Sequence, residues 1–430
     1  MQPLAIPRDL RNSEPRLRET LTASSLLVCV RHADAQAGEM VSFSLYVHIP
    51  YCQAKCPYCD FNSYAAATWP EADYTRALVQ EMERRRSEAP FAGESLRTLF
   101  FGGGTPSLFA AESIGTILEA ANRRFAIERG AEITLEANPG TLSEAKLAGL
   151  RAAGVNRLSL GAQSFNNETL RFLGRIHDAD QTRQAVAMAH RVGFDRLNLD
   201  LIFAVPGQTP ESVLADLEQA AALGPDHISA YNLTFEEGTA FFIDLKRGRI
   251  KALANDEQAA MYAAVRMELP RRGWAMYEIS NYARAGHEAR HNLTYWRGQT
   301  YLGIGAGAHS FALAASDSGP APHPYGRRWW NERNPGRYIE LAARDGCAES
   351  GSEEIDQITG ASEFVFLNLR LRAGFTEQAF AARMGRRFDE VFGARAARLV
   401  EGGLLVRSGE RVFLSDRGLE LADSVFAEFV

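Results

Sequence analysis

The stretch Tyr46-Val-His-Ile-Pro-Tyr-Cys-Gln-Ala-Lys-Cys-Pro-Tyr-Cys-Asp-Phe61 places three cysteines, Cys52, Cys56 and Cys59, on one short loop. Thiolates are soft ligands, and the spacing C-x3-C-x2-C favours an iron–sulfur cluster. A structural zinc site normally takes four protein ligands in two pairs, and no second pair follows here. The simpler alternative is a group of buried or disulfide-bonded cysteines, but such dense spacing leaves little room for core packing. Because three cysteines leave one iron of a four-iron cube open, the loop predicts an iron–sulfur site that a small chelating molecule can reach.

Short apolar runs alternate with amphipathic segments around this loop. The runs predict strands at 44–49, 96–101, 132–137, 157–160, 196–203 and 227–231, with helices at 71–88, 114–125, 142–153, 182–192 and 211–223. Regular alternation of this kind indicates a parallel sheet with right-handed crossovers. Six units are fewer than the eight of a closed TIM barrel. The pattern alone therefore allows a partial (β/α)6 barrel or a doubly wound sheet.

Polar segments follow the predicted strands where each strand ends. The cysteine loop follows the first strand, and Gly102-Gly-Gly-Thr-Pro106 follows the second. Glu136-Ala-Asn-Pro, Gly161-Ala-Gln163 and Asp200 belong to the next three strands. Parallel α/β folds place their chemistry at the carboxyl ends of strands, so these segments are expected to meet at one mouth. The glycine run permits close backbone approach to a ligand, although a tight turn is the alternative interpretation.

Composition is that of a globular enzyme-like chain. The 430 residues suffice for one large and one smaller domain, with 46% hydrophobic and 23% charged residues and a net charge of −6. An acidic balance gives no electrostatic basis for nucleic-acid binding. Cys29 and Cys347 stand alone, which is no disulfide framework and indicates a reducing, cytoplasmic location. No apolar stretch approaches the roughly 20 residues of a membrane span.

Residues 1–40 form an N-terminal extension with a weak imitation of a signal peptide. Arg31 and His32 interrupt the approach to the supposed cleavage site, and an oxidising destination would harm a cluster. We expect either a disordered extension or a translation start at Met40, which directly precedes the first strand.

Together, the Tyr-Val-His-Ile-Pro lead-in, the cysteine loop and Gly-Gly-Gly-Thr-Pro-Ser resemble the radical S-adenosylmethionine (SAM) superfamily, in its oxygen-independent coproporphyrinogen oxidase-like branch. The resemblance runs from about Leu45 to the C-terminus. It implies a partial (β/α)6 TIM-like barrel that carries a [4Fe–4S] cluster. It also implies that the open iron chelates SAM, whose reductive cleavage gives a 5′-deoxyadenosyl radical.

The resemblance assigns roles to residues at matching positions. It implies that Cys52, Cys56 and Cys59 ligate the cluster. It implies cofactor contacts for Tyr46 and Tyr58 (cluster and adenosine), Gly103, Gly104 and Thr105 (the amino end of SAM), Glu136 (amino group or ribose), Gln163 (SAM), Arg175 (the SAM carboxylate) and Asp200 (ribose). A structural ion pair between Arg175 and Asp200, and a turn-capping role for Gln163, are the alternatives.

Two features separate the branches of this family. Coproporphyrinogen dehydrogenases carry a further cysteine at the position of Phe61, and an N-terminal motif that this chain lacks. The form with phenylalanine, and the H-N-x-x-Y-W motif His291-Asn-Leu-Thr-Tyr-Trp296, resemble the HemW group of heme chaperones. That resemblance implies that the protein binds heme and delivers it to apo-hemoproteins such as respiratory enzymes. It also implies transient contact with membrane respiratory complexes, and a homodimer as one expected state. The alternative is a radical SAM oxidoreductase acting on coproporphyrinogen III or another tetrapyrrole.

Candidate heme contacts follow from the same motif. His291 is a predicted heme-binding residue, because neutral imidazole is a common ligand of heme iron. Its alternative role is to tie a segment to the barrel through hydrogen bonds. His309 is a second candidate ligand, and Arg327-Arg-Trp-Trp330 offers cations and aromatic rings, either for a porphyrin or for packing.

The remaining boundaries are predicted from changes in pattern. We expect the barrel over 41–310, a connector over 311–354 and a C-terminal helical, winged-helix-like domain over 355–430. That domain lacks a clustered basic face, so we expect a substrate cover rather than DNA binding. Ala204-Val205-Pro206 stands where relatives often have Gly-Leu-Pro, which predicts a reshaped loop because alanine adopts positive φ poorly.

Overall fold

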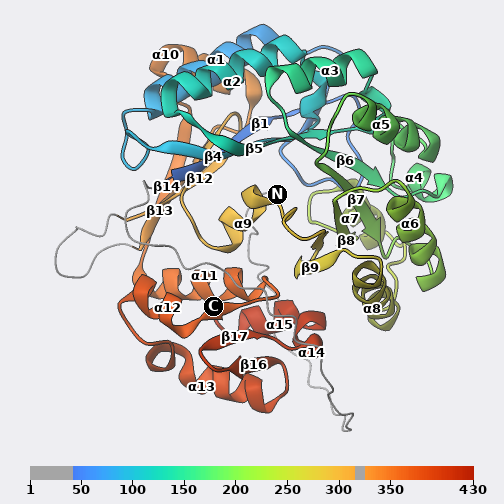
Figure 1. The fold of residues 1–430 in the computed structure, drawn as a ribbon, viewed down its shortest axis with the longest axis vertical. Helices are drawn as coiled ribbons and strands as arrows, with labels where there is room; N and C mark the ends of the chain where they lie inside the picture. The colour runs from blue at the N-terminus through green and yellow to red at the C-terminus, as the bar shows by residue number, and fades with distance from the viewer. Residues whose placement is uncertain (1–41, 315–324) are drawn as a thin grey trace.

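The structure is a computed structural model that describes residues 42–314 and 325–430. The expectations for residues 1–40, including the start at Met40, lie outside the described residues. Within the described ranges the chain forms a curved sheet wrapped by helices, with a smaller helical unit below it (Figure 1).

One 12-stranded sheet, in the order β14-β13-β12-β11-β1-β4-β5-β6-β7-β8-β10-β9, forms the body of the protein. The strands from β11 to β8 in this order run parallel. Their bounds are β1 Ser42–Ile49, β4 Ser95–Gly103, β5 Ile127–Ala137, β6 Arg157–Gln163, β7 Leu197–Phe203, β8 His227–Asn232 and β11 Tyr301–Ile304. The six predicted strands are therefore present, and they lie side by side in the order in which they follow along the chain. β11 adds a parallel neighbour to β1 that the alternation pattern did not indicate.

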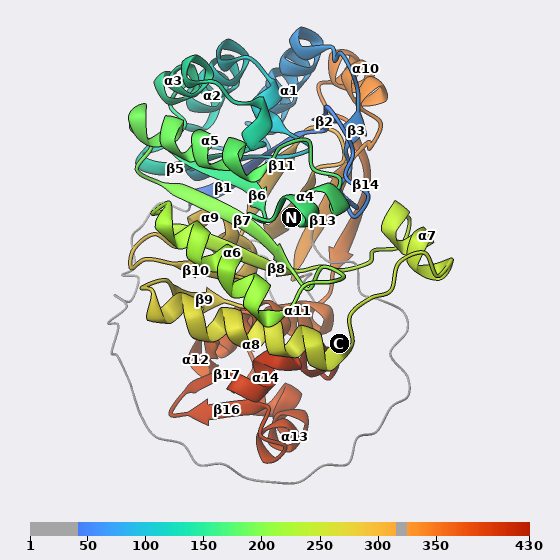
Figure 2. The same cartoon turned by 90° about the vertical axis from the view of Figure 1, so that its right-hand side faces the viewer.

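Helices cover the outer, convex side of this sheet (Figures 1 and 2). They are α1 Glu71–Arg85, α2 Ala111–Phe125, α3 Glu144–Ala153, α5 Ala179–Arg191, α6 Pro210–Ala222 and α8 Asn255–Arg271, with α4 Asn167–Phe172 and α7 Ala240–Lys246 near the strand ends. Local capping fixes several starts: the Asp178 side chain accepts from Gln181 N in a capping box, and Thr209 precedes Pro210 at the first turn. Helices on one side of a curved parallel sheet make the partial barrel, so the predicted fold class is confirmed and the doubly wound alternative is wrong.

The sheet buries the main hydrophobic core against these helices. Leu45, Val47, Leu99, Leu135 and Leu160 have no exposed surface and lie in one cluster with apolar residues of the helices. These apolar residues alternate along the strands with residues of the opposite face, so one face of the sheet packs against the helices. This packing fixes the strand ends, and with them the position of the loops at the carboxyl edge.

The predicted connector, 311–354, contributes regular structure. Residues of β12 His309–Leu313, β13 Gly326–Asn331 and β14 Glu349–Ile355 extend the sheet in antiparallel fashion beyond β11, and α10 Pro335–Asp345 packs on α1. The other end of the sheet consists of β9 Ala275–Glu278 and β10 Asn281–Ala283, followed by α9 Arg290–Trp296. The short strands β2 Tyr51–Cys52 and β3 Tyr64–Ala65 pair across the cysteine loop.

The C-terminal unit has its own core. It contains α11 Gln357–Leu369, α12 Glu377–Met384, α13 Phe388–Glu401, α14 Asp416–Glu420 and α15 Ala422–Ala427, with the strands β15 Phe375–Thr376, β16 Leu405–Ser408 and β17 Arg411–Leu414. The strands form a three-stranded antiparallel sheet in the order β15-β17-β16. Phe364, Phe375, Phe380, Phe388 and Phe392 meet inside this unit. Helices with a small wing are the predicted winged-helix-like arrangement.

The loop after β7 keeps a backbone that favours glycine. Ala204 has φ of 61° and is buried, so the predicted reshaping does not remove the positive φ. Left-handed backbone costs an L-residue roughly 1–2 kcal/mol. The alanine is therefore accommodated at the expense of folding stability.

Replacing Ala204 by glycine is expected to raise the free energy of unfolding by about 1 kcal/mol, because relief of backbone strain exceeds the entropy that glycine adds to the unfolded chain. Chemical denaturation measures it. Ala187→Gly, on the exposed face of helix α5, is the control and is expected to lower stability by about 1 kcal/mol. A loss of stability in Ala204→Gly would contradict the prediction.

Candidate functional site

The cysteine loop leaves the carboxyl end of β1 and is fixed by polar contacts on both sides. Lys55 Nζ donates to the carbonyls of Phe61 and Ser63, each at 3.0 Å. Asn62 Nδ2 donates to the carbonyls of Ala306 and Arg333 at 2.9 and 3.0 Å. These bonds join the loop to the chain after β11, so the thiols are presented on a supported backbone.

Each cysteine sulfur has a polar neighbour from a different part of the barrel. The Thr105 hydroxyl donates to Cys52 Sγ at 3.5 Å, Arg175 Nη1 donates to Cys56 Sγ at 3.3 Å, and the Ser63 hydroxyl lies 3.8 Å from Cys59 Sγ. Burial raises the pKa of the Cys52 and Cys59 thiols. Hydrogen bonds to ligating sulfurs tune the potential of iron–sulfur clusters. The loop thus supplies three thiols together with the donors that a cluster's sulfurs need.

The three thiols of the loop are not arranged around a single point. All three cysteines are free, and in the described part of the chain no group of three His, Cys, Asp or Glu converges on one metal ion. A four-iron cube takes each cysteine on a different iron, so its ligands need not converge on a point. The donor set therefore fits a cluster better than a single ion.

The glycine loop is packed directly against the cysteine loop. Gly104 N donates to Ile49 O and Thr105 N to Tyr51 O, each at 2.8 Å. A Cβ on Gly104 would lie 2.6 Å from the carbonyl oxygen of Tyr51, so a side chain cannot fit there. Gly103 has φ of 117°, which favours glycine. Close approach of two backbones explains the glycines, as the sequence suggested.

Two carboxyl groups line the interior below these loops. Glu136 Oε2 accepts from Gly103 N at 3.2 Å, and Asp200 accepts from Ser159 Oγ at 2.9 Å and Asn198 Nδ2 at 2.8 Å. Burial, together with the charge of Asp200, raises the pKa of Glu136 to about 7. Burial also raises the pKa of Asp200. The site therefore holds carboxyl groups that a cationic ligand would help to ionise.

Arg175 bridges the cysteine loop and β6. Its Nη1 donates to Tyr58 Oη at 3.3 Å as well as to Cys56 Sγ, and its Nη2 donates to Gly161 O at 3.1 Å. Arg175 Nε is buried with no partner. The alternative ion pair with Asp200 is not among these contacts. A guanidinium with a buried free N–H, beside the thiols, suits a carboxylate ligand.

Gln163 ends β6 with φ of 63°, a strained conformation for a residue other than glycine, and its side chain lies against Gly161 near Arg175. Strained residues concentrate at functional sites. The structure thus brings the cysteines, the glycine loop, Glu136, Arg175, Gln163 and Asp200 to the carboxyl edge of one sheet.

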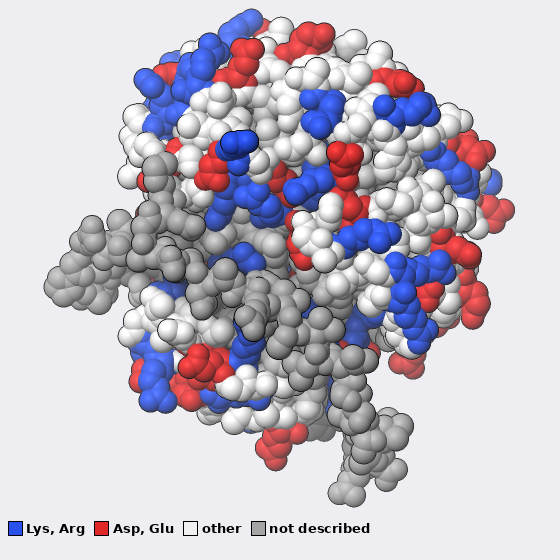
Figure 3. All heavy atoms as spheres, viewed as in Figure 1, with Lys and Arg blue, Asp and Glu red and all other residues white. Residues whose placement is uncertain are grey.

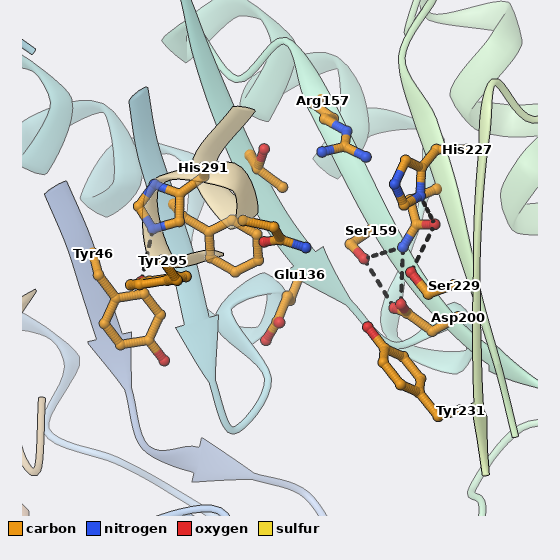
Figure 4. Close-up of a pocket in the computed structure, with 14 residues that line it drawn as sticks. Tyr46, Glu136, Arg157, Ser159, Asp200, His227, Ser229, Tyr231, His291 and Tyr295 are labelled. Atoms are coloured by element: carbon orange, nitrogen blue, oxygen red, sulfur yellow. Dashed lines mark hydrogen bonds between the residues drawn. The ribbon is translucent and has the colours of Figure 1, made fainter. Parts of the chain in front are cut away.

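A pocket lined mainly by polar side chains continues from this edge into the barrel (Figure 4). Glu136 lies between two groups: Tyr46, His291 and Tyr295 on one side, and Ser159, Asp200, Ser229 and Tyr231 on the other. Further lining residues were not predicted from the sequence: Arg157, Ser159, Asn198, His227, Ser229 and Tyr231. The sequence does contain a pattern that could have predicted them. Polar residues recur at every second position in strands β6, β7 and β8, and such positions share one face of the sheet.

His291 lies on the floor of this cavity, at the amino end of the barrel. It is 1% exposed, its Nδ1 lies 2.8 Å from Thr98 Oγ1, and its Nε2 lies 2.9 Å from Tyr295 Oη. Burial lowers the pKa of His291 to about 3. The Glu132 carboxylate accepts from the backbone N–H groups of Arg290 and His291, which holds the first turn of α9 in place. Both ring nitrogens are thus bound by protein, and heme contact by His291 stays a prediction.

These features define a class of protein. A parallel partial barrel with three free cysteines after its first strand and a polar cavity below them is the radical SAM architecture, and residues 46–220 match the Radical SAM superfamily. Residues 355–421 match the HemN C-terminal domain. The solved structure of coproporphyrinogen III oxidase (HemN) from Escherichia coli has a TM-score of 0.76 and 24% identity, with 90% of each chain covered.

Relatives place the chain more narrowly. It is 36% identical to "Heme chaperone HemW" of Bacillus subtilis over 90% of this chain and 99% of that one. It is 40% identical to the protein of the same name from Escherichia coli, over 69% of this chain and 77% of that one. The chain therefore belongs to the HemW family. Membership of the radical SAM superfamily implies a [4Fe–4S] cluster and SAM, and the residues at the carboxyl edge fit both.

Proposed function

We propose that this protein is a heme chaperone that binds heme, carries a [4Fe–4S] cluster with SAM, and passes heme to apo-hemoproteins. The observation that carries the proposal is the match to HemW along 99% of the length of the Bacillus subtilis protein. Phe61 supports it, because this side chain is 38% exposed on the cysteine loop, at the position where the dehydrogenases carry a further cysteine.

Different residues of the site would bind the cluster and SAM. Cys52, Cys56 and Cys59 would hold the cluster, and the donors to their sulfurs would set its stability. Gly103, Gly104, Thr105, Glu136, Gln163, Arg175 and Asp200 would orient SAM, with Tyr46 and Tyr58 beside the cluster and adenosine. When bound, the cluster supplies an electron to SAM, and the barrel supplies orientation and shelter from water.

Finer features of this function are proposed from the resemblance. Respiratory enzymes are the proposed acceptors, reached by transient contact with membrane complexes, and a homodimer is a proposed state. In the described part of the chain, no helix is long and apolar enough to cross a membrane. We propose a cytoplasmic location. On the face shown in Figure 3, acidic and basic side chains are interspersed, which gives no basis there for nucleic-acid binding.

The test is made on one anaerobically reconstituted sample of the full chain. Hemin titration is expected to reach one heme per chain, and mixing with an apo-hemoprotein is expected to move the Soret absorption to the acceptor. In parallel, dithionite, SAM and coproporphyrinogen III are supplied. Multiple turnovers to protoporphyrinogen IX, without stoichiometric heme binding, would overturn the proposal in favour of a coproporphyrinogen oxidoreductase.

A further inference from the structure

The histidines of this protein differ in how their imidazoles are held. Seven of the nine lie in the described residues, and six of these have a ring nitrogen in a hydrogen bond: His48, His177, His190, His227, His287 and His291. Among the described residues, His309 alone has no hydrogen bond at either ring nitrogen, and its Nδ1 is buried without a partner. A structural histidine normally has its polar atoms satisfied. His309 therefore has a nitrogen lone pair that the fold does not use.

Stacking holds this imidazole in one orientation. His309 opens β12 and stands opposite Trp330 of β13 in the strand register. The two rings stack with centroids 5.8 Å apart and an interplanar angle of 30°. Gly351 of β14 lies under the indole, where a Cβ would come within 2.6 Å of the Trp330 ring. The missing side chain at Gly351 lets Trp330 lie flat and support the imidazole from one side.

The side chain of His309 remains partly exposed while Nδ1 is buried, so Nε2 is the nitrogen that a ligand can reach. Burial lowers the pKa of His309, and the charges of Arg328 and Arg333 act in the same direction. The ring is accordingly neutral near pH 7, which is the form that binds metals.

The surroundings supply charge for an anionic ligand. Arg328 is committed to Glu353 and Glu363 at 2.8 and 2.7 Å. Arg333 is exposed, and its guanidinium has no ion pair within the described ranges. Its backbone carbonyl is bonded to Asn62 of the cysteine loop. A free cation thus lies near an unused imidazole, on a segment tied to the cluster site.

We propose that His309 binds the iron of heme through Nε2, with Trp330 holding the imidazole and Arg333 receiving a propionate. This inference rests on the proposed heme-chaperone function and assigns its binding site. Trp330 stacks on the imidazole of His309, so it would hold this ring in place when the ring binds heme.

The same geometry disfavours His291 as the iron ligand. Iron binding there would break the hydrogen bond of His291 to Thr98 or to Tyr295 and leave a buried polar group unpaired, which is unfavourable. His309 loses no protein hydrogen bond on binding. Ligating histidines usually donate their second N–H to an acceptor, which raises ligand strength. His309 has no acceptor at Nδ1, so it would bind iron weakly enough to release heme to an acceptor protein.

The test compares variants of the full reconstituted chain by hemin titration, absorption and electron paramagnetic resonance. His309→Ala is expected to lose the imidazole-type heme spectrum and to raise the Kd about tenfold or more, and added imidazole is expected to restore the spectrum. Arg333→Gln is expected to raise the Kd about threefold to tenfold with an unchanged spectrum. His287→Ala is the matched control, since His287 is partly exposed but bonded to Asp226 and lies at the other end of the sheet.

The outcomes separate the two proposals. If the unaltered chain binds no heme, the proposed function fails. If it binds heme and His309→Ala keeps the same spectrum and affinity, the site assignment is wrong while the function stands. Loss of the imidazole-type heme spectrum in His291→Gln but not in His309→Ala would identify His291, at the amino end of the barrel, as the iron ligand. Cluster content and far-ultraviolet circular dichroism show that each variant is folded, and imidazole rescue excludes a merely structural effect.

Discussion

Replacing Cys59 by serine is expected to abolish assembly of the [4Fe–4S] cluster while the barrel stays folded. A serine hydroxyl is a poor substitute for a thiolate at iron, because soft sulfur ligands select these clusters. Cys59 lies on a loop outside the main hydrophobic core, so the midpoint of thermal unfolding of the cluster-free chain should change by only a few degrees. The loss is measured by iron and sulfide analysis after anaerobic reconstitution, and by the absorption of the [4Fe–4S] cluster at about 400 nm.

Cys347 provides the control for this experiment. Its thiol is also partly exposed and accepts a hydrogen bond from Arg85 Nη2 at 3.2 Å, but it belongs to the segment between α10 and β14 and not to the cysteine loop. Cys347→Ser is expected to keep full iron content. Equal cluster content in Cys59→Ser and the unaltered chain would refute the assignment of the loop as the cluster site.

Glu136→Gln is expected to weaken SAM binding and to stabilise the SAM-free protein at pH 8. Loss of a charged hydrogen-bond acceptor beside a cationic ligand costs about 1.5–3 kcal/mol, which is about tenfold to a hundredfold in Kd. Calorimetric titration of SAM into reconstituted protein measures this change. Glu119→Gln, which makes the same change on the exposed face of α2, is the control.

The stability effect follows from the sign of the pKa shift. The folded-state pKa of Glu136 is about 7, above its ordinary value of 4.5. The folded protein therefore holds this proton more tightly than the unfolded chain, and stability falls as the pH rises between about 4.5 and 7. Since part of Glu136 contacts solvent, the gain in Glu136→Gln at pH 8 is expected to be between about 1 and 3 kcal/mol. A variant whose stability keeps the pH slope of the unaltered chain over this range would contradict the prediction.

Local patterns were sufficient to predict alternating strands and helices with a parallel sheet, whereas the choice of a partial barrel over a doubly wound sheet followed from the family resemblance. Apolar runs gave six strands in order, and three closely spaced cysteines gave the type of metal site. β11 was missed because Tyr301–Ile304 is short and has no helix before it comparable to the other crossovers. β12 to β14 were missed for a related reason: their pairing joins segments far apart in sequence, such as Arg328 with Glu353, which no local periodicity reveals.

The cysteine loop was predicted because the identity and spacing of its residues imply their chemistry, whereas the role of Glu136 was predicted from the family resemblance. Residues of the site were not predicted where only their position in the folded chain makes them important. Ser159 and Asn198 are ordinary residues that become important because their strands turn them toward Asp200. Likewise, His291 and His309 look equivalent in the sequence, and only the structure shows that both ring nitrogens of His291 are hydrogen-bonded, whereas those of His309 have no hydrogen bond within the described ranges.

An incomplete barrel leaves its sheet with two ends, and the chain treats them differently. At one end, Glu278 of β9 bridges to Leu371 of the C-terminal unit. At the other, β14 is the last strand of the sheet, and it presents Glu349, Glu353 and Glu354 in seven residues. Each of these carboxylates pairs with an arginine of the same chain: Glu349 with Arg85 and Arg327, Glu353 with Arg328, and Glu354 with Arg327. A second copy that met this edge would face a row of charged side chains, a known safeguard of natural sheets against polymerisation. Any dimer of this protein is therefore expected to form through another surface, and the charged edge should keep the concentrated protein free of sheet-extended aggregates.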